Sequence, residues 1–166
     1  MRSSTFVRKV PVPTIPVGVI LAGVILAGTT PSRAEDVAAK PVRFTPPVED
    51  GKALFSGAAI ARIVGLREGG DGYVSVRAAP STEAAELDRL TASRRIIALT
   101  PPTDWDAARF IGVIYPAGGG DATTASLYEV CDVSEIPPTA PPFDRPYTGP
   151  CRSGWVHKRF IEVLAD

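Results

Sequence analysis

The pattern of apolar and polar positions along the chain predicts a series of short β-strands. Residues 73–77 alternate, with Val74 and Val76 on one face, and a period of two with one apolar face is typical of a half-buried strand. Short runs rich in β-branched and aromatic residues predict further strands at 59–66, 94–99, 110–115, 127–133, 155–156 and 160–164. Glycine and proline separate these runs, as expected for turns and loops.

Residues 84–90 fit two patterns. Leu87 and Leu90 are three positions apart, which is helical spacing. We favour a strand, because residues 91–93 form a short turn that joins it as a hairpin to the run at 94–99. Six or seven short strands without an amphipathic helix of about 10–15 residues predict an all-β sandwich or barrel.

Residues 1–34 have the features of a secretory signal peptide, namely a basic start, an apolar run at 17–28 and small residues before a cleavage site after Ala34. The apolar run of about 12 residues is shorter than the roughly 20 residues of a membrane-spanning helix. We therefore expect a periplasmic or secreted protein with no stable membrane span after cleavage. The alternative is an uncleaved N-terminal anchor.

Residues 35–58 are rich in proline, alanine and charge, which predicts a flexible arm. The alternative is that its apolar residues pack onto the following domain, namely Val42, Phe44 and Leu54–Phe55. After cleavage, 14 basic and 18 acidic residues remain, a net charge of about −4. A chain with this charge balance lacks the excess of positive charge that nucleic-acid binding requires.

The two cysteines, Cys131 and Cys151, most simply form a disulfide in an exported protein. The bridge would close a loop of about 20 residues and stabilise the fold by roughly 3 kcal/mol in the chain-entropy model. The alternative is a pair of metal ligands, which needs further ligands nearby. The chain has a single histidine, His157, so we expect no metal site.

Two motifs about 80 residues apart resemble the bacterial SH3-like (Src-homology-3-like) domain family. Residues 76–80 read Val-Arg-Ala-Ala-Pro, like the Val-Arg-x-x-Pro of the family's early strand. Residues 154–156 read Gly-Trp-Val, like the family's late Gly-Trp-Val. The resemblance implies a small barrel of short antiparallel strands over residues 59–166, ending in one helical turn and a final strand.

Two features depart from the family's pattern. Phe110 stands where the family usually has a central tryptophan, and residues 117–150 are far longer than the usual loop. The long segment carries Cys131, with Cys151 just after it. The chain is thus similar to an exported subfamily, and the resemblance implies a binding or targeting module without a cofactor.

Aromatic residues near loops are the candidate ligand-binding groups, because they offer flat apolar surface at a low entropic cost. Tyr73, Trp105 and Tyr147 are predicted to line one shallow groove, and Arg77 shares the strand face of Tyr73. Trp155 is interpreted as core. The prolines between 137 and 150 favour an extended polyproline conformation, which would let that loop cover the groove.

No residue pattern predicts catalysis. A cysteine nucleophile beside a histidine is not expected when both cysteines are bridged, and no Gly-x-Ser-x-Gly elbow occurs. Asp104 and Asp106 are interpreted as parts of a solvated loop. The glycines at 118–120 are not followed by the Gly-Lys-Ser/Thr of a phosphate-binding loop.

The sequence therefore predicts an exported, non-catalytic binding module whose partner is peptidoglycan, through its peptides, or an envelope protein. One alternative is a small secreted hydrolase or inhibitor in which Asp104, Asp106 or His157 acts. Another is a structural accessory without a ligand groove. Its sign would be burial of all five loop-proximal aromatic residues, Tyr73, Trp105, Tyr115, Tyr147 and Trp155.

Overall fold

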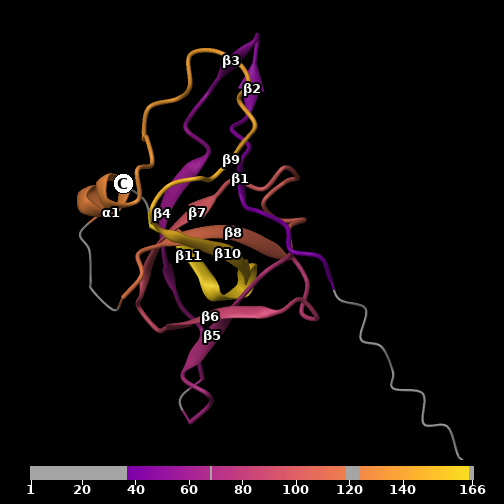
Figure 1. Ribbon diagram of the computed structural model, residues 1–166, viewed down its shortest axis with the longest axis vertical. Helices are drawn as coiled ribbons and strands as arrows, with labels where there is room; N and C mark the ends of the chain where they lie inside the picture. Colours follow the sequence, from indigo (N-terminus) through magenta and orange to yellow (C-terminus); the bar gives the residue numbers. More distant parts are fainter. Residues whose placement is uncertain (1–36, 68, 119–123, 165–166) are drawn as a thin grey trace, which may run out of the picture. The chain divides into compact units, whose positions relative to one another are not determined.

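A seven-stranded antiparallel sheet is the largest element of the described fold (Figure 1). The computed structural model describes residues 37–67, 69–118 and 124–164, and the segment expected to be a signal peptide lies outside them. The strand order is β11-β4-β7-β8-β10-β5-β6. The strands are β4 (Ala58–Ile63), β5 (Tyr73–Arg77), β6 (Glu86–Thr91), β7 (Arg95–Leu99), β8 (Phe110–Tyr115), β10 (Arg152–His157) and β11 (Ile161–Val163).

Smaller elements surround this sheet. Strand β1 (Arg43–Phe44) pairs with β9 (Arg145–Pro146), although about 100 residues separate them. Strands β2 (Val48–Glu49) and β3 (Lys52–Ala53) form a second two-stranded ribbon. Helix α1 spans Thr124–Val130, and the 3₁₀ turn η1 spans Lys158–Phe160.

The predicted all-β fold is confirmed, and the predicted strand over 73–77 has the observed bounds. Residues 84–90 were correctly favoured as a strand, but the expected hairpin pairing is wrong. Strand β6 pairs with β5, whereas β7 pairs with β4 and β8. The turn at 91–94 therefore carries the chain across the sheet. Closure into a barrel stays a prediction, because β11 and β6 are the two ends of the strand order.

Strands β7 and β8 are buried on both faces, which explains their nearly continuous apolar sequences. Along β7, Ile96 belongs to one hydrophobic cluster and Ile97 to another. The first cluster gathers residues from the sheet and its hairpins, including Val76 and Val113. The second lies on the other face and includes residues of α1 and β1. The sheet thus separates two apolar layers.

The predicted strand over 127–133 is wrong, because residues 124–130 form α1. Leu127, Tyr128 and Cys131 are buried in the second cluster, while Val130 is exposed. Burial at positions i, i+1 and i+4 is helical spacing, not the alternation of a strand. The long segment expected as a loop therefore contributes a packed layer over β4, β7 and β8.

Part of the segment expected to be a flexible arm is packed. Val42 and Phe44 are buried in the second cluster, whereas Leu54 and Phe55 are exposed. Gly112 in β8 makes room for the arm, because a Cβ there would lie 3.3 Å from Val42. This corrects the expectation for residues 42–44, which pack on the sheet.

Strand β10 crosses the sheet and fixes the position of Trp155. It pairs with β8 along its whole length and with β5 at Trp155 and Arg77. A Cβ at Gly154 would lie 2.5 Å from Val76 Cγ1 and 2.9 Å from the Arg77 carbonyl oxygen. Glycine is therefore the residue that lets β10 approach β5 this closely.

Candidate functional site

The best candidate site is a pocket of about 210 Å³ beside Trp155, lined mainly by apolar atoms. Its residues come from three parts of the chain, namely the N-terminal segment, the sheet with the loop after β7, and the segment before β9. The lining residues are Lys40, Pro41, Arg43, Thr45, Leu99, Thr100, Pro101, Pro102, Gly112, Asp144 and Trp155.

The sheet supplies the base of the pocket. Leu99 ends β7, Gly112 lies in the middle of β8, and Trp155 stands opposite Gly112 on β10. Trp155 is half-buried and packs against the second cluster, so one part of its ring stabilises the fold while another part remains accessible. This arrangement offers a rigid aromatic surface next to a glycine.

The N-terminal segment forms one wall and is held by backbone hydrogen bonds. The Lys40 amide donates to the Ala78 carbonyl at 2.8 Å. The Trp155 indole Nε1–H donates to the Lys40 carbonyl at 2.6 Å. Two positions further along the segment, the Val42 carbonyl accepts from the Tyr147 amide at 3.1 Å. The wall is therefore an extended piece of chain docked on the sheet.

Two charged groups that line the pocket, Arg43 and Asp144, form an ion pair with each other. Arg43 Nε lies 2.8 Å from Asp144 Oδ1, and its Nη2 donates to the Asp144 carbonyl at 3.3 Å. Thr45 Oγ1 donates to the Thr100 carbonyl at 2.5 Å. These contacts engage Arg43, Asp144 and Thr45 within the protein, and the rest of the lining is mainly apolar, so the pocket is best suited to an apolar group.

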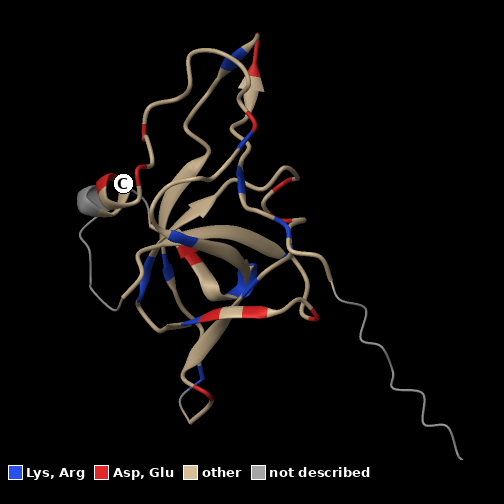
Figure 2. Ribbon diagram, in the orientation of Figure 1, with Lys and Arg blue, Asp and Glu red and all other residues tan. Residues whose placement is uncertain are grey.

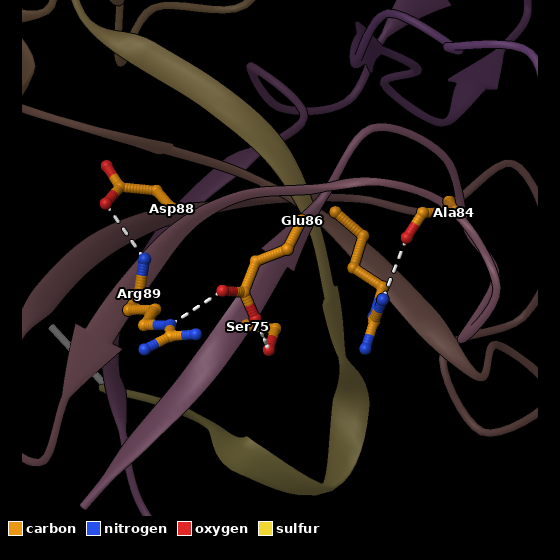
Figure 3. Close-up of polar contacts among 6 residues, drawn as sticks. Ser75, Ala84, Glu86, Asp88 and Arg89 are labelled. Atoms are coloured by element: carbon orange, nitrogen blue, oxygen red, sulfur yellow. Dashed lines mark hydrogen bonds and ion pairs between the residues drawn. The ribbon is translucent and has the colours of Figure 1, made fainter. Parts of the chain in front are cut away.

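Of the residues predicted to bind ligand, Tyr73 and Arg77 lie on β5. The guanidinium of Arg89 on β6 stacks over the Tyr73 ring at 4.2 Å. Arg77 Nη1 donates to the Ala84 carbonyl at 2.8 Å (Figure 3). Figure 3 also shows the side chains of Ser75 and Arg89 both directed at the Glu86 carboxylate. Arg89 Nε lies 2.6 Å from Glu86 Oε1. Arg77 is thus engaged in joining β5 to the turn before β6.

Trp105 and Tyr147 lie in other parts of the molecule. Trp105 packs against the first cluster, and its carbonyl accepts from Lys158 Nζ at 2.9 Å. Tyr147 packs against the second cluster, edge-on to Phe44 at 6.2 Å between ring centroids. Burial raises the pKa of the Tyr147 hydroxyl. The described pockets do not bring Tyr73, Trp105 and Tyr147 together in one groove.

The sign expected for an accessory without a groove is absent from the described residues. Among the five aromatic residues, Tyr115 alone is fully buried, and the other four are half-buried. Trp155, interpreted from the sequence as core, lines the pocket. The sequence analysis missed Pro101, Pro102 and Lys40, although the two adjacent prolines already indicated a rigid loop at the end of a strand.

The residues named for a hydrolase have structural contacts. His157 caps η1, because its Nδ1 accepts from the Arg159 amide at 3.3 Å. Burial lowers the pKa of His157, and the charges of Arg159 and Arg109 lower it further. Lys158 Nζ lies 3.5 Å from Asp106 Oδ1. The described residues contain no cluster of three or more potential metal ligands.

Charged residues concentrate away from the central strands. Figure 2 shows β8 without charge and β6 with both signs. On β6, Asp88 Oδ2 accepts from Arg152 Nη1 at 2.8 Å. Burial acts to raise the pKa of Asp88, but hydrogen bonds from Arg152 and the Arg89 amide outweigh it and hold the pKa below its ordinary value.

Comparisons with protein-family models, with curated proteins and with solved structures find no match for this chain. Within the part of the chain that the structure describes, no helix is long and apolar enough to cross a membrane.

Proposed function

We propose that the chain is an exported, non-catalytic binding module of the SH3-like type, and that the Trp155 pocket holds part of an extended peptide. The peptide is a component of the cell envelope, either a stem peptide of peptidoglycan or a segment of a partner protein. The observation that carries this proposal is the protein's own segment at 40–44, which lies extended on the sheet beside the pocket.

The docked segment indicates what kind of ligand this face accepts. Its backbone both donates, from the Lys40 amide, and accepts, at the Lys40 and Val42 carbonyls. Pro41 favours an extended backbone, and Trp155 supplies the flat surface on which such a backbone rests. A second extended chain entering the pocket would meet the same aromatic surface together with Pro101 and Pro102.

Two further observations support the proposal. The disulfide between Cys131 and Cys151 fits the oxidising compartment that the signal-like N-terminus predicts. The pocket lining contains no cysteine, serine or histidine, and of its remaining nucleophile types Thr45 and Asp144 are held in hydrogen bonds within the protein.

A rim variant tests the proposal. The purified protein is incubated with peptidoglycan sacculi and, separately, with envelope extract and immobilised stem peptide. Pro102→Glu places a charge at the apolar pocket, and we expect retention to fall at least tenfold, because a carboxylate near apolar surface is costly to desolvate. Thr103→Glu is the matched control, since Thr103 is exposed and outside the pocket lining.

Three outcomes would decide the matter. Retention of the wild type and the control, with loss in Pro102→Glu, supports the pocket. Equal retention of all three proteins would move the ligand elsewhere on the surface. No retention of the wild type on any of these materials would overturn the binding module.

A further inference from the structure

Tyr147 connects the disulfide to the pocket wall. Its hydroxyl donates to the Cys131 carbonyl at 2.9 Å and accepts from the Cys151 amide at 2.9 Å. The disulfide links these same two residues, which are 20 positions apart. The phenol therefore lies between the two half-cystines and bonds to the backbone of both.

On its other side, Tyr147 holds the wall itself. Its amide donates to the Val42 carbonyl, and its ring packs on Phe44. The two residues before it form β9, in which Pro146 stands opposite Arg43. Asp144, one position earlier, forms the ion pair with Arg43 at the pocket rim. A continuous series of contacts thus runs from the disulfide to the pocket.

The space around this connection is tight. A Cβ at Gly149 would lie 2.5 Å from the Tyr147 hydroxyl oxygen and 2.6 Å from the Cys131 carbonyl oxygen. Both distances are shorter than a Cβ tolerates, and one of the two atoms belongs to backbone. Gly149 therefore lets residues 147–151 fold back against the end of α1.

The main sheet does not share this dependence. The ladders of this sheet join strands β4, β5, β6, β7, β8, β10 and β11. None of the residues paired in them lies between 117 and 150. The segment carrying Tyr147 and β9 is thus bonded to the backbone of both half-cystines, whereas the ladders of β4, β7, β8 and β10 contain no residue of that segment. The wall and the sheet can therefore separate in their response to reduction.

We propose that the pocket wall assembles only in the oxidised protein, with Tyr147 as the positioning residue between the disulfide and the wall. This deepens the proposed function and rests on it for its role in binding. Oxidation proceeds by thiol–disulfide exchange with a disulfide-class oxidant. The Cys131 and Cys151 thiols lose two electrons and two protons and form the S–S bond, while the oxidant's own disulfide is reduced to two thiols.

The test uses C131S/C151S, Y147F and a matched control, V74A. Val74 is buried in the first cluster, whereas Tyr147 and the two half-cystines belong to the second. Truncation of Val74 therefore weakens the fold without touching the connection between the disulfide and the wall. Hydrogen exchange is measured at the Lys40 and Tyr147 amides and the Trp155 indole N–H. Binding to stem peptide or sacculi is measured in parallel.

We expect C131S/C151S to exchange at least tenfold faster at these three groups, with β4, β7 and β8 amides still protected, and to bind at least tenfold more weakly. Y147F is expected to change in the same direction by a smaller factor. In V74A, the exchange rates of the three groups are expected to rise no more than those of the sheet amides. If the three groups in C131S/C151S exchange as slowly as in the wild type, the inference is overturned. If they exchange at the wild-type rate in Y147F alone, Tyr147 has no part in it.

The two measurements distinguish failure of the proposed function from failure of this inference. If the wild type binds nothing, the exchange measurement still decides whether the wall depends on the disulfide. A C131S/C151S protein that does not fold would also overturn the inference, because the main sheet is expected to keep its ladders without the disulfide. Gly149→Ala is a second test of Tyr147, because it keeps both cysteines and displaces the Tyr147 hydroxyl. Faster exchange of the wall in Gly149→Ala supports the role of Tyr147, and unchanged exchange removes Tyr147 from the inference.

Discussion

At the scale of single residues, Tyr115 combines full burial with a hydrogen-bonded carboxylate. Its side chain is 2% exposed, and its hydroxyl bonds to Asp88, which also pairs with Arg152. Burial raises the pKa of Tyr115 well above its ordinary value, and the negative charge of Asp88 raises it further. Ionising this phenol in the folded protein is therefore strongly disfavoured.

Stability should fall as the solution becomes alkaline. A tyrosine whose pKa is raised by folding contributes stability below its unfolded pKa of about 10, and loses it as pH rises through the folded pKa. We expect the urea midpoint to drop between about pH 8 and about pH 11, and to drop less in Tyr115→Phe. Part of the decrease of the urea midpoint with pH should remain in Tyr115→Phe, because burial also raises the pKa of Tyr147. An equal drop in both proteins would contradict the prediction.

At the scale of elements, α1 shows why a helix was mistaken for a strand. It is only 7 residues long, and β-branched or aromatic residues at its end resemble a strand. Its stop signal is also unusual, because Asp132 takes the left-handed conformation that glycine normally supplies. The Val133 amide then donates to the Tyr128 carbonyl at 2.9 Å and the Asp132 amide to the Glu129 carbonyl, which is a Schellman ending.

Two substitutions on α1 test its packing. Leu127 is fully buried, and Leu127→Ala should lower the free energy of unfolding by about 3 kcal/mol through lost burial and a cavity. Val130 is 51% exposed, and Val130→Ala should change it by no more than about 0.5 kcal/mol. Urea denaturation measures both. Similar losses in the two variants would mean that this face is not the packed one.

At the scale of the whole molecule, two apolar layers share the same strands. Residues of β7 and β8 contribute to both clusters, so the same strands couple the packing of the two layers. The tryptophans report on one layer each, since Trp105 packs against the first cluster and Trp155 against the second. With the disulfide intact, the shared strands should make unfolding one cooperative step.

This cooperativity is measurable with single-tryptophan proteins. Trp155→Phe leaves Trp105 as the reporter of the first layer, and Trp105→Phe leaves Trp155 as the reporter of the second. In each variant the fluorescence midpoint in urea should coincide with the midpoint of far-ultraviolet circular dichroism. A fluorescence transition that precedes the circular dichroism transition in either variant would show that its layer opens independently.

The sequence predicted what depends on local pattern. Alternation over 73–77 and continuous apolar residues over 110–115 identified two strands with their observed bounds, and the two cysteines identified the bridge. The pocket could not be predicted, because it brings Lys40 together with residues that lie far from it in the sequence, such as Pro101 and Trp155. Contacts between Arg43 and Asp144, or between Trp155 and Lys40, leave no periodic signal in the chain. They arise from the tertiary fold.

The docked segment at 40–44 has a practical consequence for handling the protein. Lys40 lines the pocket, and it lies only six positions after the predicted cleavage site at Ala34. An affinity tag or surface anchor fused ahead of this segment would therefore sit within a few residues of the pocket mouth and obstruct it. An antibody to an exposed residue outside the pocket lining, such as Glu129, avoids a fusion at this position.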